Sequence, residues 1–276
     1  MNDIIKQITT QLYSSRKIIN EVLEHKYLYY YYKTVPKKKY GDFQREENGQ
    51  KKYRDLNLTR YPLWQIQQHL HESLQQISLP NYAYGGVKQR NNVLNAMRHI
   101  NSKYFLSIDL KDYFSNIRNN QVYKMFVRRG FSPAISGVLT QLTTYTGNLP
   151  QGVSTSPVVA NLVFEETGQR LSRFINDYHI IFTSYIDDLT FSSKHDFKSL
   201  VPKIIEIIKA DGFYLNYKKI SYKTFKPEIT GLIVHEGKLC LPDKMLKKVN
   251  QMPSYRLYLQ LIERTQKDIP TAEYSI

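Results

Sequence analysis

The spacing of apolar positions divides the chain into helices and strands in an irregular order. Near-helical spacing predicts one helix over residues 2–24 and another over 63–77, the second closed by Pro80. Between them, the stretch from Lys26 to Arg60 combines a run of tyrosines with charged residues and two glycines, which indicates strands joined by a mobile basic loop. Strands interrupted by helices, without a regular βα rhythm, favour an α+β fold.

The second half of the chain continues this alternation. Apolar and β-branched runs predict strands that hold the acidic motifs described below, and further strands within residues 216–230. Helix start and stop signals predict helices from a cap at Asn120 to Gly130, from Ser132-Pro133 to about Gly147, from Pro157 to about Tyr178, over residues 203–210, and from Asp243 onward.

Two short strings place carboxylates at the ends of apolar runs. Asp109 follows one such run, and a second run predicts two strands on a tight turn with Asp187 and Asp188 at its tip. Apolar strands seldom hold bare carboxylates unless a cation neutralises them. Two divalent metals about 3.5–4 Å apart, held by bridging carboxylates, can activate an attacking hydroxyl and neutralise a leaving pyrophosphate. The three aspartates therefore predict a polymerase metal pair, and the alternative is an ordinary solvated turn.

Phe114 and the string from Leu149 to Pro157 extend this hypothesis toward a nucleotide substrate. A ring five positions after Asp109 can lie beneath the sugar and exclude a 2′-hydroxyl, although a core phenylalanine fits the same pattern. Within the string, Gly152 permits close approach of the backbone to a ligand, and Gln151 can touch the incoming sugar or base. The alternative for the string is a plain loop-to-helix cap.

Two basic residues are further candidates. An arginine fork suits phosphate oxygens, so Arg54 can reach a triphosphate from a flanking strand. Lys219 follows an apolar segment and can protonate the departing pyrophosphate. A solvated surface position fits each of them equally well. His99 is expected to be a hydrogen-bonded core histidine rather than a metal ligand.

The composition of the chain indicates the kind of partner it binds and the compartment in which it works. The net charge of +15 and the 23 tyrosines indicate a nucleic-acid partner, because phosphates attract cations and bases stack on aromatic faces. The single cysteine, Cys240, excludes an intramolecular disulfide and suits a reducing cytoplasm. No apolar run approaches the roughly 18 residues that a membrane span needs, and no secretion signal is evident. We therefore expect a cytoplasmic protein without a membrane partner.

Taken in order, these blocks resemble those of a reverse transcriptase, and within that class those of bacterial retron reverse transcriptases. The resemblance extends from about Arg54 to Asp243. It is carried by Asp109 to Phe114, Leu149 to Pro157, Tyr185 to Ser192, Ile229 to Leu232, and the run from Gly85 to His99, which ends in Asn95-Ala96-x-x-His99.

The resemblance implies a right-hand polymerase fold. Its parts would be an N-terminal helix and fingers over residues 1–103, a palm over 104–235 with finger-like helices around 119–147, and a short thumb over 236–276. It also implies two Mg²⁺ ions and dNTP substrates, with the ions on Asp109, Asp187 and Asp188, Phe114 as the sugar gate, and Gln151 and Arg54 beside the nucleotide.

The retron resemblance further implies particular partners. Such enzymes use their own structured noncoding RNA, msr-msd, as template and primer, and make a branched RNA–DNA hybrid called msDNA. Many work with an effector protein in antiphage defence. Two alternatives stay open: a group II intron-like or other defence-associated reverse transcriptase, and an RNA-binding subunit of the same fold without catalysis.

Overall fold

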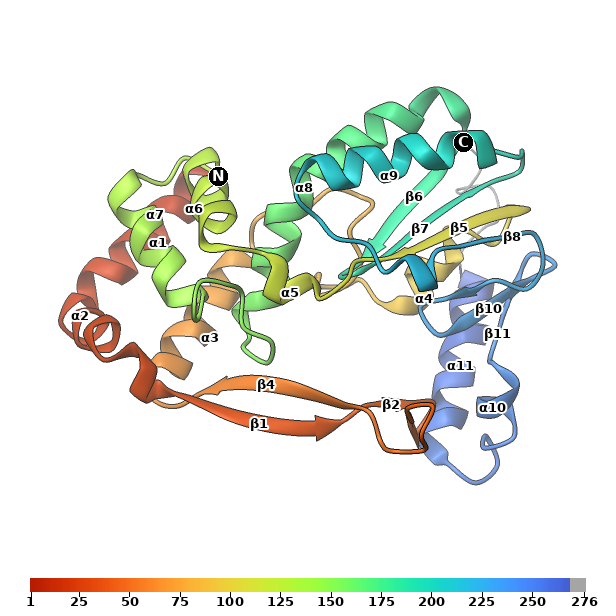
Figure 1. Cartoon of the computed structure of the whole chain (residues 1–276), viewed down its shortest axis with the longest axis horizontal. Coiled ribbons are helices and arrows are strands. Elements are labelled where there is room, and N and C mark those ends of the chain that lie inside the picture. The colour runs from red at the N-terminus through yellow and green to blue at the C-terminus, as the bar shows by residue number, and fades with distance from the viewer. Residues whose placement is uncertain (269–276) are drawn as a thin grey trace. The chain divides into compact units, whose positions relative to one another are not determined.

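In the computed structural model, which describes residues 1–268, the chain divides into two units that are each discontinuous in sequence (Figure 1). The first unit comprises Met1–Leu79 and Asp112–Phe164, and the second comprises Pro80–Lys111 and the chain from Glu165 onward. These limits differ from the expected subdomain boundaries, so the division into fingers, palm and thumb stays a prediction. Residues 269–276 of the expected thumb lie outside the described residues.

The N-terminal segment forms two helices rather than one. α1 (Asn2–Ser14) ends at Ser15, and α2 (Arg16–Glu24) follows directly. The apolar spacing is helical on both sides of the break, which is why the sequence predicts a single helix. The hydroxyl of Ser14 donates to the carbonyl of Gln11 at 2.9 Å, a side-chain bond that competes with the helical backbone pattern at this point.

Four further helices and the first half of a fifth belong to the first unit. α3 (Leu63–Leu74) packs on α1 and confirms the predicted helix over 63–77, and α6 (Asn119–Arg128) packs on α7 (Pro133–Thr143). The predicted cap at Asn120 is wrong, because the cap position is Arg118, whose backbone N–H donates to Oε1 of Gln121 at 2.9 Å. The last two elements are the short α5 (Tyr113–Asn116) and the first half of α8 (Thr155–Ile175).

Two of these helices have ends that differ from the sequence prediction. α7 ends at Thr143 rather than near Gly147, because residues 145–148 form a tight turn closed by hydrogen bonds between Tyr145 and Asn148. α8 starts at Thr155, two positions before Pro157. Proline is tolerated in the first turn of a helix, so it marks the region of a start rather than its first residue.

The stretch from Lys26 to Arg60 contains strands, as predicted. A long antiparallel ribbon pairs β1 (Tyr30–Pro36) with β4 (Tyr53–Thr59), and the connecting loop contains the two-residue strands β2 (Lys38–Lys39) and β3 (Asp42–Phe43). The short helix η1 (Lys26–Tyr29) leads into it. Most ribbon side chains are exposed or half-buried.

The core of the second unit is a four-stranded antiparallel sheet in the order β6-β7-β5-β8. Figure 1 shows α9 (Val201–Ala210) and the second half of α8 over one face of this sheet, on which the rings of Phe182 and Phe191 stack with centroids 4.6 Å apart. The strands are β5 (Tyr104–Asp109), β6 (Ile181–Tyr185), β7 (Asp188–Ser193) and β8 (Ser221–Lys223).

Smaller elements complete the second unit. A three-stranded sheet precedes two helices, which confirms helical structure from Asp243 onward. The predicted strands within 216–230 are only partly present, since a short helical turn occupies the start of that stretch. The elements are α4 (Asn92–Met97), η2 (Asn176–Tyr178), η3 (Lys198–Leu200), η4 (Tyr217–Lys219), β9 (Glu228–Ile229), β10 (Leu232–His235), β11 (Lys238–Cys240), α10 (Asp243–Leu246) and α11 (Pro253–Asp268).

The mixture of helices with separate antiparallel sheets confirms the α+β class. Among residues 1–268, no helix combines the length and the apolar character needed to cross a bilayer.

Candidate active site

The backbone of the four-stranded sheet brings the three predicted aspartates to one end. Asp109 is the last residue of β5 and pairs in register with Asp188, the first residue of β7. The N–H of Leu110 donates to the carbonyl of Asp187 at 2.8 Å, which fixes the turn between β6 and β7 beside the end of β5. The antiparallel register, rather than proximity in sequence, therefore places these three residues at the same end of the sheet.

The tip of this hairpin has an unusual backbone. Ile186 has φ = 58°, in the left-handed region that a β-branched residue rarely adopts. Gly85 lies directly against it: a Cβ at position 85 would be 2.6 Å from the nitrogen of Ile186 and 2.8 Å from the carbonyl carbon of Tyr185. Only glycine fits here, because it alone lets two backbones come this close.

The segment around Gly85 is held by strand-like hydrogen bonds. The N–H of Ser184 donates to the carbonyl of Tyr82 at 2.7 Å, and the N–H of Tyr84 donates to the carbonyl of Ser184 at 2.8 Å. Residues 82–86 thus follow the free edge of β6 in parallel and brace the aspartate turn. Local sequence patterns do not indicate this support, because the contact joins positions about a hundred residues apart.

The ammonium of Lys219 neutralises the carboxylate of Asp109 at the end of the apolar strand β5. Its Nζ donates to Oδ2 of Asp109 at 2.7 Å, with the Asp109 side chain 13% exposed and the Lys219 side chain 62% exposed. Burial acts to lower the pKa of Lys219, but its hydrogen bond to Asp109 and the charges of all three aspartates outweigh this effect and raise the pKa above 10.5. The ammonium therefore stays protonated at neutral pH.

The donor atoms at this end of the sheet suit a hard divalent cation, which prefers carboxylate oxygens. In the part of the chain that the structure describes, no group of three or more His, Cys, Asp or Glu side chains is arranged to hold a metal ion. Asp109 instead holds the ammonium of Lys219. The donor types and their common position thus fit Mg²⁺, and the side chains would have to turn from Lys219 to bind it.

The other predicted site residues belong to the first unit. Gly152 (φ = 113°) approaches β4 closely, since a Cβ there would lie 3.0 Å from Cδ2 of Leu58, and the carbonyl of Gln151 accepts from the N–H of Asn57 at 2.8 Å. The close approach that this glycine permits is therefore to a strand of its own unit. Arg54 is exposed on β4.

Phe114 lies on α5 and is half-buried, whereas its neighbour Tyr113 is buried and donates its hydroxyl to the carbonyl of Ala160 at 3.0 Å. The rings of the two residues are 5.8 Å apart. The tyrosine thus takes the core position, and part of the Phe114 ring stays accessible.

His99 ties together the two strands of the aspartate hairpin. It is fully buried, with Nδ1 2.7 Å from Oγ of Ser192 and Nε2 2.8 Å from Oγ1 of Thr183. Burial, with a smaller contribution from the charge of Arg98, lowers the pKa of His99 to about 3, so the ring is neutral. The expected hydrogen-bonded core histidine is confirmed.

Two of the blocks that carry the retron resemblance contact each other. Asn92, on α4, donates from Nδ2 to the carbonyl of Thr230 at 3.1 Å, and Oγ1 of Thr230 donates back to the carbonyl of Asn92 at 3.2 Å. Thr230 is itself left-handed, with φ = 47°. Nδ2 of Asn92 also donates to the hydroxyl of Tyr258 on α11. The block from 85 to 99 therefore contacts the Thr230 turn, α11 and the aspartate hairpin, a connection absent from any local sequence signal.

Comparison with known proteins agrees with this arrangement. The family model described as reverse transcriptase (RNA-dependent DNA polymerase) matches residues 35–259. The chain belongs to this family.

Among curated proteins of the family, this chain is similar to retron enzymes. It is 31% identical to Retron Ec86 reverse transcriptase of Escherichia coli, over 65% of this chain and 58% of that protein. It is 26% identical to Retron Se72 reverse transcriptase of Salmonella heidelberg, over 80% of this chain and 60% of that protein. The resemblance stated from the motifs is confirmed, and the chain spans about 60% of the length of these relatives.

Solved structures support the fold. Telomerase from Candida albicans, in complex with a TWJ fragment of telomeric RNA, matches with a TM-score of 0.54 and 10% identity, over 76% of this chain and 46% of that one. At this identity the likeness concerns the fold alone, and with the family match it confirms the α+β right-hand polymerase fold.

Proposed function

We propose that this chain is an RNA-directed DNA polymerase of retron type, which copies a structured noncoding RNA into DNA by nucleotidyl transfer. The observation that carries the proposal is the pairing of Asp109 with Asp188 at the sheet end where Leu110 also binds the Asp187 backbone. Family membership and the retron relatives support the same activity.

In this proposal the three aspartates hold two Mg²⁺ ions. When bound, such ions activate the attacking hydroxyl of the primer and neutralise the pyrophosphate that leaves. The chain's own contribution is to hold the carboxylates in register on a braced hairpin, because a site is only as well positioned as the residues that support it.

Lys219 is the proposed general acid. Its raised pKa keeps a proton on Nζ at neutral pH, and its largely exposed side chain can turn toward a phosphate oxygen. While it contacts Asp109, the same ammonium reduces the repulsion between neighbouring carboxylates.

The first unit supplies the proposed contacts to the dNTP. The accessible part of the Phe114 ring would exclude a ribose 2′-hydroxyl. Gln151 and Gly152, in the loop before α8, would contact the sugar or base, and the exposed guanidinium of Arg54 would bind triphosphate oxygens.

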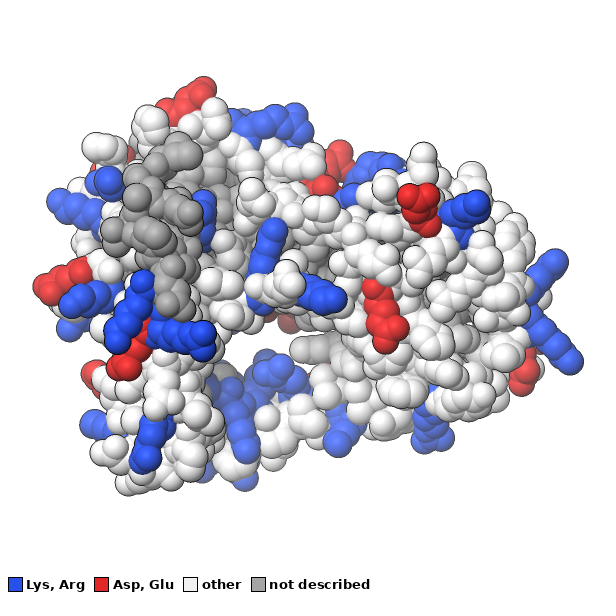
Figure 2. Space-filling view, turned by 180° about the vertical axis from the view of Figure 1, so that it is seen from behind, with Lys and Arg blue, Asp and Glu red and all other residues white. Residues whose placement is uncertain are grey.

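The proposed partner is a noncoding RNA of the msr-msd kind, with msDNA as product, cytoplasmic location, and an effector protein in antiphage defence. The names of the curated relatives favour the retron setting over a group II intron-like one. Figure 2 shows Lys and Arg spread over the visible face with fewer acidic side chains between them, as expected for a chain of net charge +15 that binds phosphates.

The test is to express the chain with the noncoding RNA encoded beside its gene and to analyse the copurified nucleic acid. A branched RNA–DNA species that incorporates labelled dNTPs is expected from the wild type and not from Asp187→Asn. Linear cDNA without a branch would favour the intron-like alternative. Equal inactivity of both proteins, with RNA still bound, would favour a binding subunit.

A further inference from the structure

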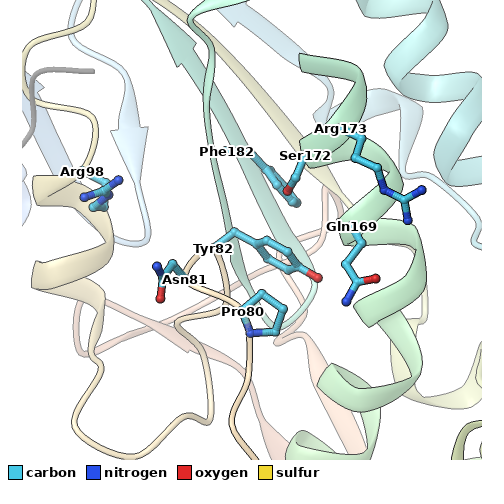
Figure 3. A pocket seen from close by; sticks show the side chains of 8 residues that line it. All are labelled: Pro80, Asn81, Tyr82, Arg98, Gln169, Ser172, Arg173 and Phe182. Atoms are coloured by element: carbon cyan, nitrogen blue, oxygen red, sulfur yellow. The ribbon is translucent and has the colours of Figure 1, made fainter. Parts of the chain in front are cut away.

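The segment that braces the aspartate turn also lines a pocket of about 490 Å³ in the second unit (Figure 3). Tyr82 comes from this segment, Phe182 from β6, and Gln169 and Arg173 from neighbouring turns of α8. Arg98, directly after α4, contributes a further side. A pocket of this volume is large enough for a single nucleotide.

The aromatic wall of the pocket is fixed in place. The rings of Tyr82 and Phe182 have centroids 4.9 Å apart, and the hydroxyl of Tyr82 donates to the carbonyl of Glu165 at 3.0 Å. The Tyr82 ring fills the space that a side chain at Gly168 would need. These neighbours fix the ring, which is only half-buried, so it can receive a ligand without first losing conformational freedom.

The charged side chains that line the pocket are positive. Arg98 and Arg173 both line it, together with the amides of Asn81 and Gln169, and the described lining residues include no Asp or Glu. Oε1 of Glu165 accepts from Nε2 of Gln169 at 3.2 Å. Figure 3 shows Arg98 and Arg173 on opposite sides of the Tyr82 ring, an arrangement that suits the phosphates on either side of one planar base.

We propose that this pocket binds one nucleotide of a single RNA strand, with the phosphates facing Arg98 and Arg173 and the base facing Tyr82. This inference rests on the proposed function, because it takes the RNA partner as given. An RNA strand is favoured over an acidic protein segment because the pocket combines cations, amides and an aromatic face, the combination that recognises unpaired bases.

The pocket lies near the aspartate turn. Asp187 follows Phe182 by five positions of strand and turn, which span at most about 17 Å at the usual strand rise of 3.3 Å per residue. The pocket-lining segment continues directly into Gly85 at the aspartate turn. RNA bound here would be anchored close to the proposed catalytic end of the sheet.

The decisive experiment compares two double variants of equal net charge. Arg98→Gln/Arg173→Gln changes the pocket, and Lys203→Gln/Lys209→Gln changes exposed cations on α9. Binding of a mixed-sequence 12-nucleotide single-stranded RNA is measured by fluorescence anisotropy across a salt series. For the pocket variant we expect about tenfold weaker binding than for the α9 variant, and a slope of log K against log salt that is flatter by about 1.4 than in the wild type, the value for two lost phosphate contacts.

Equal affinities and equal slopes in the two variants would overturn the proposal. Thermal unfolding checks that both proteins are folded. If the pocket pair is not, the single variant Arg173→Gln, at an exposed helix position, is expected to flatten the slope by about 0.7, and an unchanged slope would overturn the proposal equally.

Two further arms identify the ligand. The same RNA carrying 4-thiouridine is expected to cross-link to the peptide that contains Tyr82, and cross-links confined to other peptides would contradict the assignment. Free AMP at millimolar concentration is expected not to displace the RNA. Displacement would show that the pocket takes a mononucleotide instead of a strand.

Primer extension on a generic RNA template with a DNA primer, at saturating concentrations, separates this inference from the proposed function. We expect the α9 variant, whose substitutions lie outside the pocket, to extend the primer at the wild-type rate. An inactive wild type would refute the polymerase, whereas the salt slopes would still decide whether the pocket binds RNA.

Discussion

Two antiparallel pairs of strands in this molecule have opposite surroundings. In the strands of the β6–β7 hairpin, which holds Asp187 and Asp188 at its tip, most side chains are buried. In the β1–β4 ribbon most side chains are exposed or half-buried, and the loop joining its strands places Nζ of Lys51 4.2 Å from the ring centre of Phe43. Antiparallel pairing thus fixes the positions of buried side chains in the hairpin, whereas in the ribbon it presents an accessible aromatic and basic surface.

The comparison shows what holds a candidate catalytic group still. The hairpin is fixed by contacts from outside its own strands, namely Gly85 at the tip and His99 across the middle. In the ribbon, the pairing of β1 with β4 extends over seven positions. We therefore expect changes in the hairpin to alter chemistry or folding, and changes on the ribbon to alter affinity for nucleic acid.

The largest effect is expected at the tip of the hairpin. Asp188→Asn keeps the size of the side chain but removes a charge proposed to hold metal, so primer extension should fall about a thousandfold, equivalent to about 4 kcal/mol. Steady-state incorporation of labelled dNTPs measures it. Asp112→Asn is the control, because Asp112 is exposed, is left-handed (φ = 46°), and asparagine tolerates that backbone. Equal losses of primer extension in the two variants would contradict a specific role of Asp188 in catalysis.

The next effect concerns the glycine that braces the turn. In Gly85→Ala the new methyl would be 2.6 Å from the nitrogen of Ile186, so the turn must shift. We expect kcat to fall about a hundredfold with little change in KM for the template, because a displacement of about 1 Å can cost this much.

A matched glycine gives the control for this variant. Gly137, in the interior of α7, has open space where a Cβ would lie. Gly137→Ala should stabilise the protein by about 0.5–1 kcal/mol, as measured by thermal unfolding, and leave kcat unchanged. A full-activity Gly85→Ala enzyme would show that the turn does not depend on this contact.

A third effect, of about 2 kcal/mol, concerns acid stability. The folded-state pKa of His99 is about 3, below the unfolded value of 6.5, so the unfolded chain takes up a proton that the folded chain does not. The stability contributed by the neutral ring is complete above pH 6.5 and is lost as the pH falls below it. Between pH 7 and pH 5 the free energy of unfolding should drop by about 2 kcal/mol from this residue alone.

Urea unfolding at the two pH values measures this loss. His99→Gln should show a smaller difference between pH 7 and pH 5, whereas His25→Gln, at an exposed position, should behave like the wild type. An unchanged pH dependence in His99→Gln would contradict the assignment of the acid sensitivity to this buried ring.

The smallest effect is expected on the ribbon. Tyr32 is 63% exposed on β1, so Tyr32→Ala should change stability by less than about 0.5 kcal/mol. Loss of one stacking surface should weaken binding of single-stranded RNA by about 1 kcal/mol, roughly fivefold. Anisotropy titration beside thermal unfolding tests both parts. A marked loss of stability would show that the ribbon is a structural element like the hairpin.

The sequence predicted those parts of the molecule that depend on local patterns. The helix over 63–77, the strand that ends at Asp109 and the strand that begins at Asp188 follow from apolar periodicity, and they appear within a few residues of the expected limits. The break at Ser15 and the cap at Arg118 were not predicted, because single side-chain hydrogen bonds decide them.

The contacts that hold the candidate site in place could not be predicted from the sequence. The contact of Gly85 with Ile186 and the bonds between Asn92 and Thr230 join segments about a hundred residues apart or more. Nothing in the local pattern around either partner indicates the other. The motif residues were identifiable from composition and order, while the residues that hold them became visible only in the folded chain.

The bond between Lys219 and Asp109 has one more consequence. Because Nζ of Lys219 contacts Oδ2 of Asp109, a divalent ion that binds this oxygen would have to displace the ammonium, which under the proposed mechanism could then turn to the pyrophosphate. Its departure would free an oxygen at the moment when a divalent ion needs one. A resting enzyme would then carry its own internal counter-ion, exchanged for magnesium only when substrate arrives.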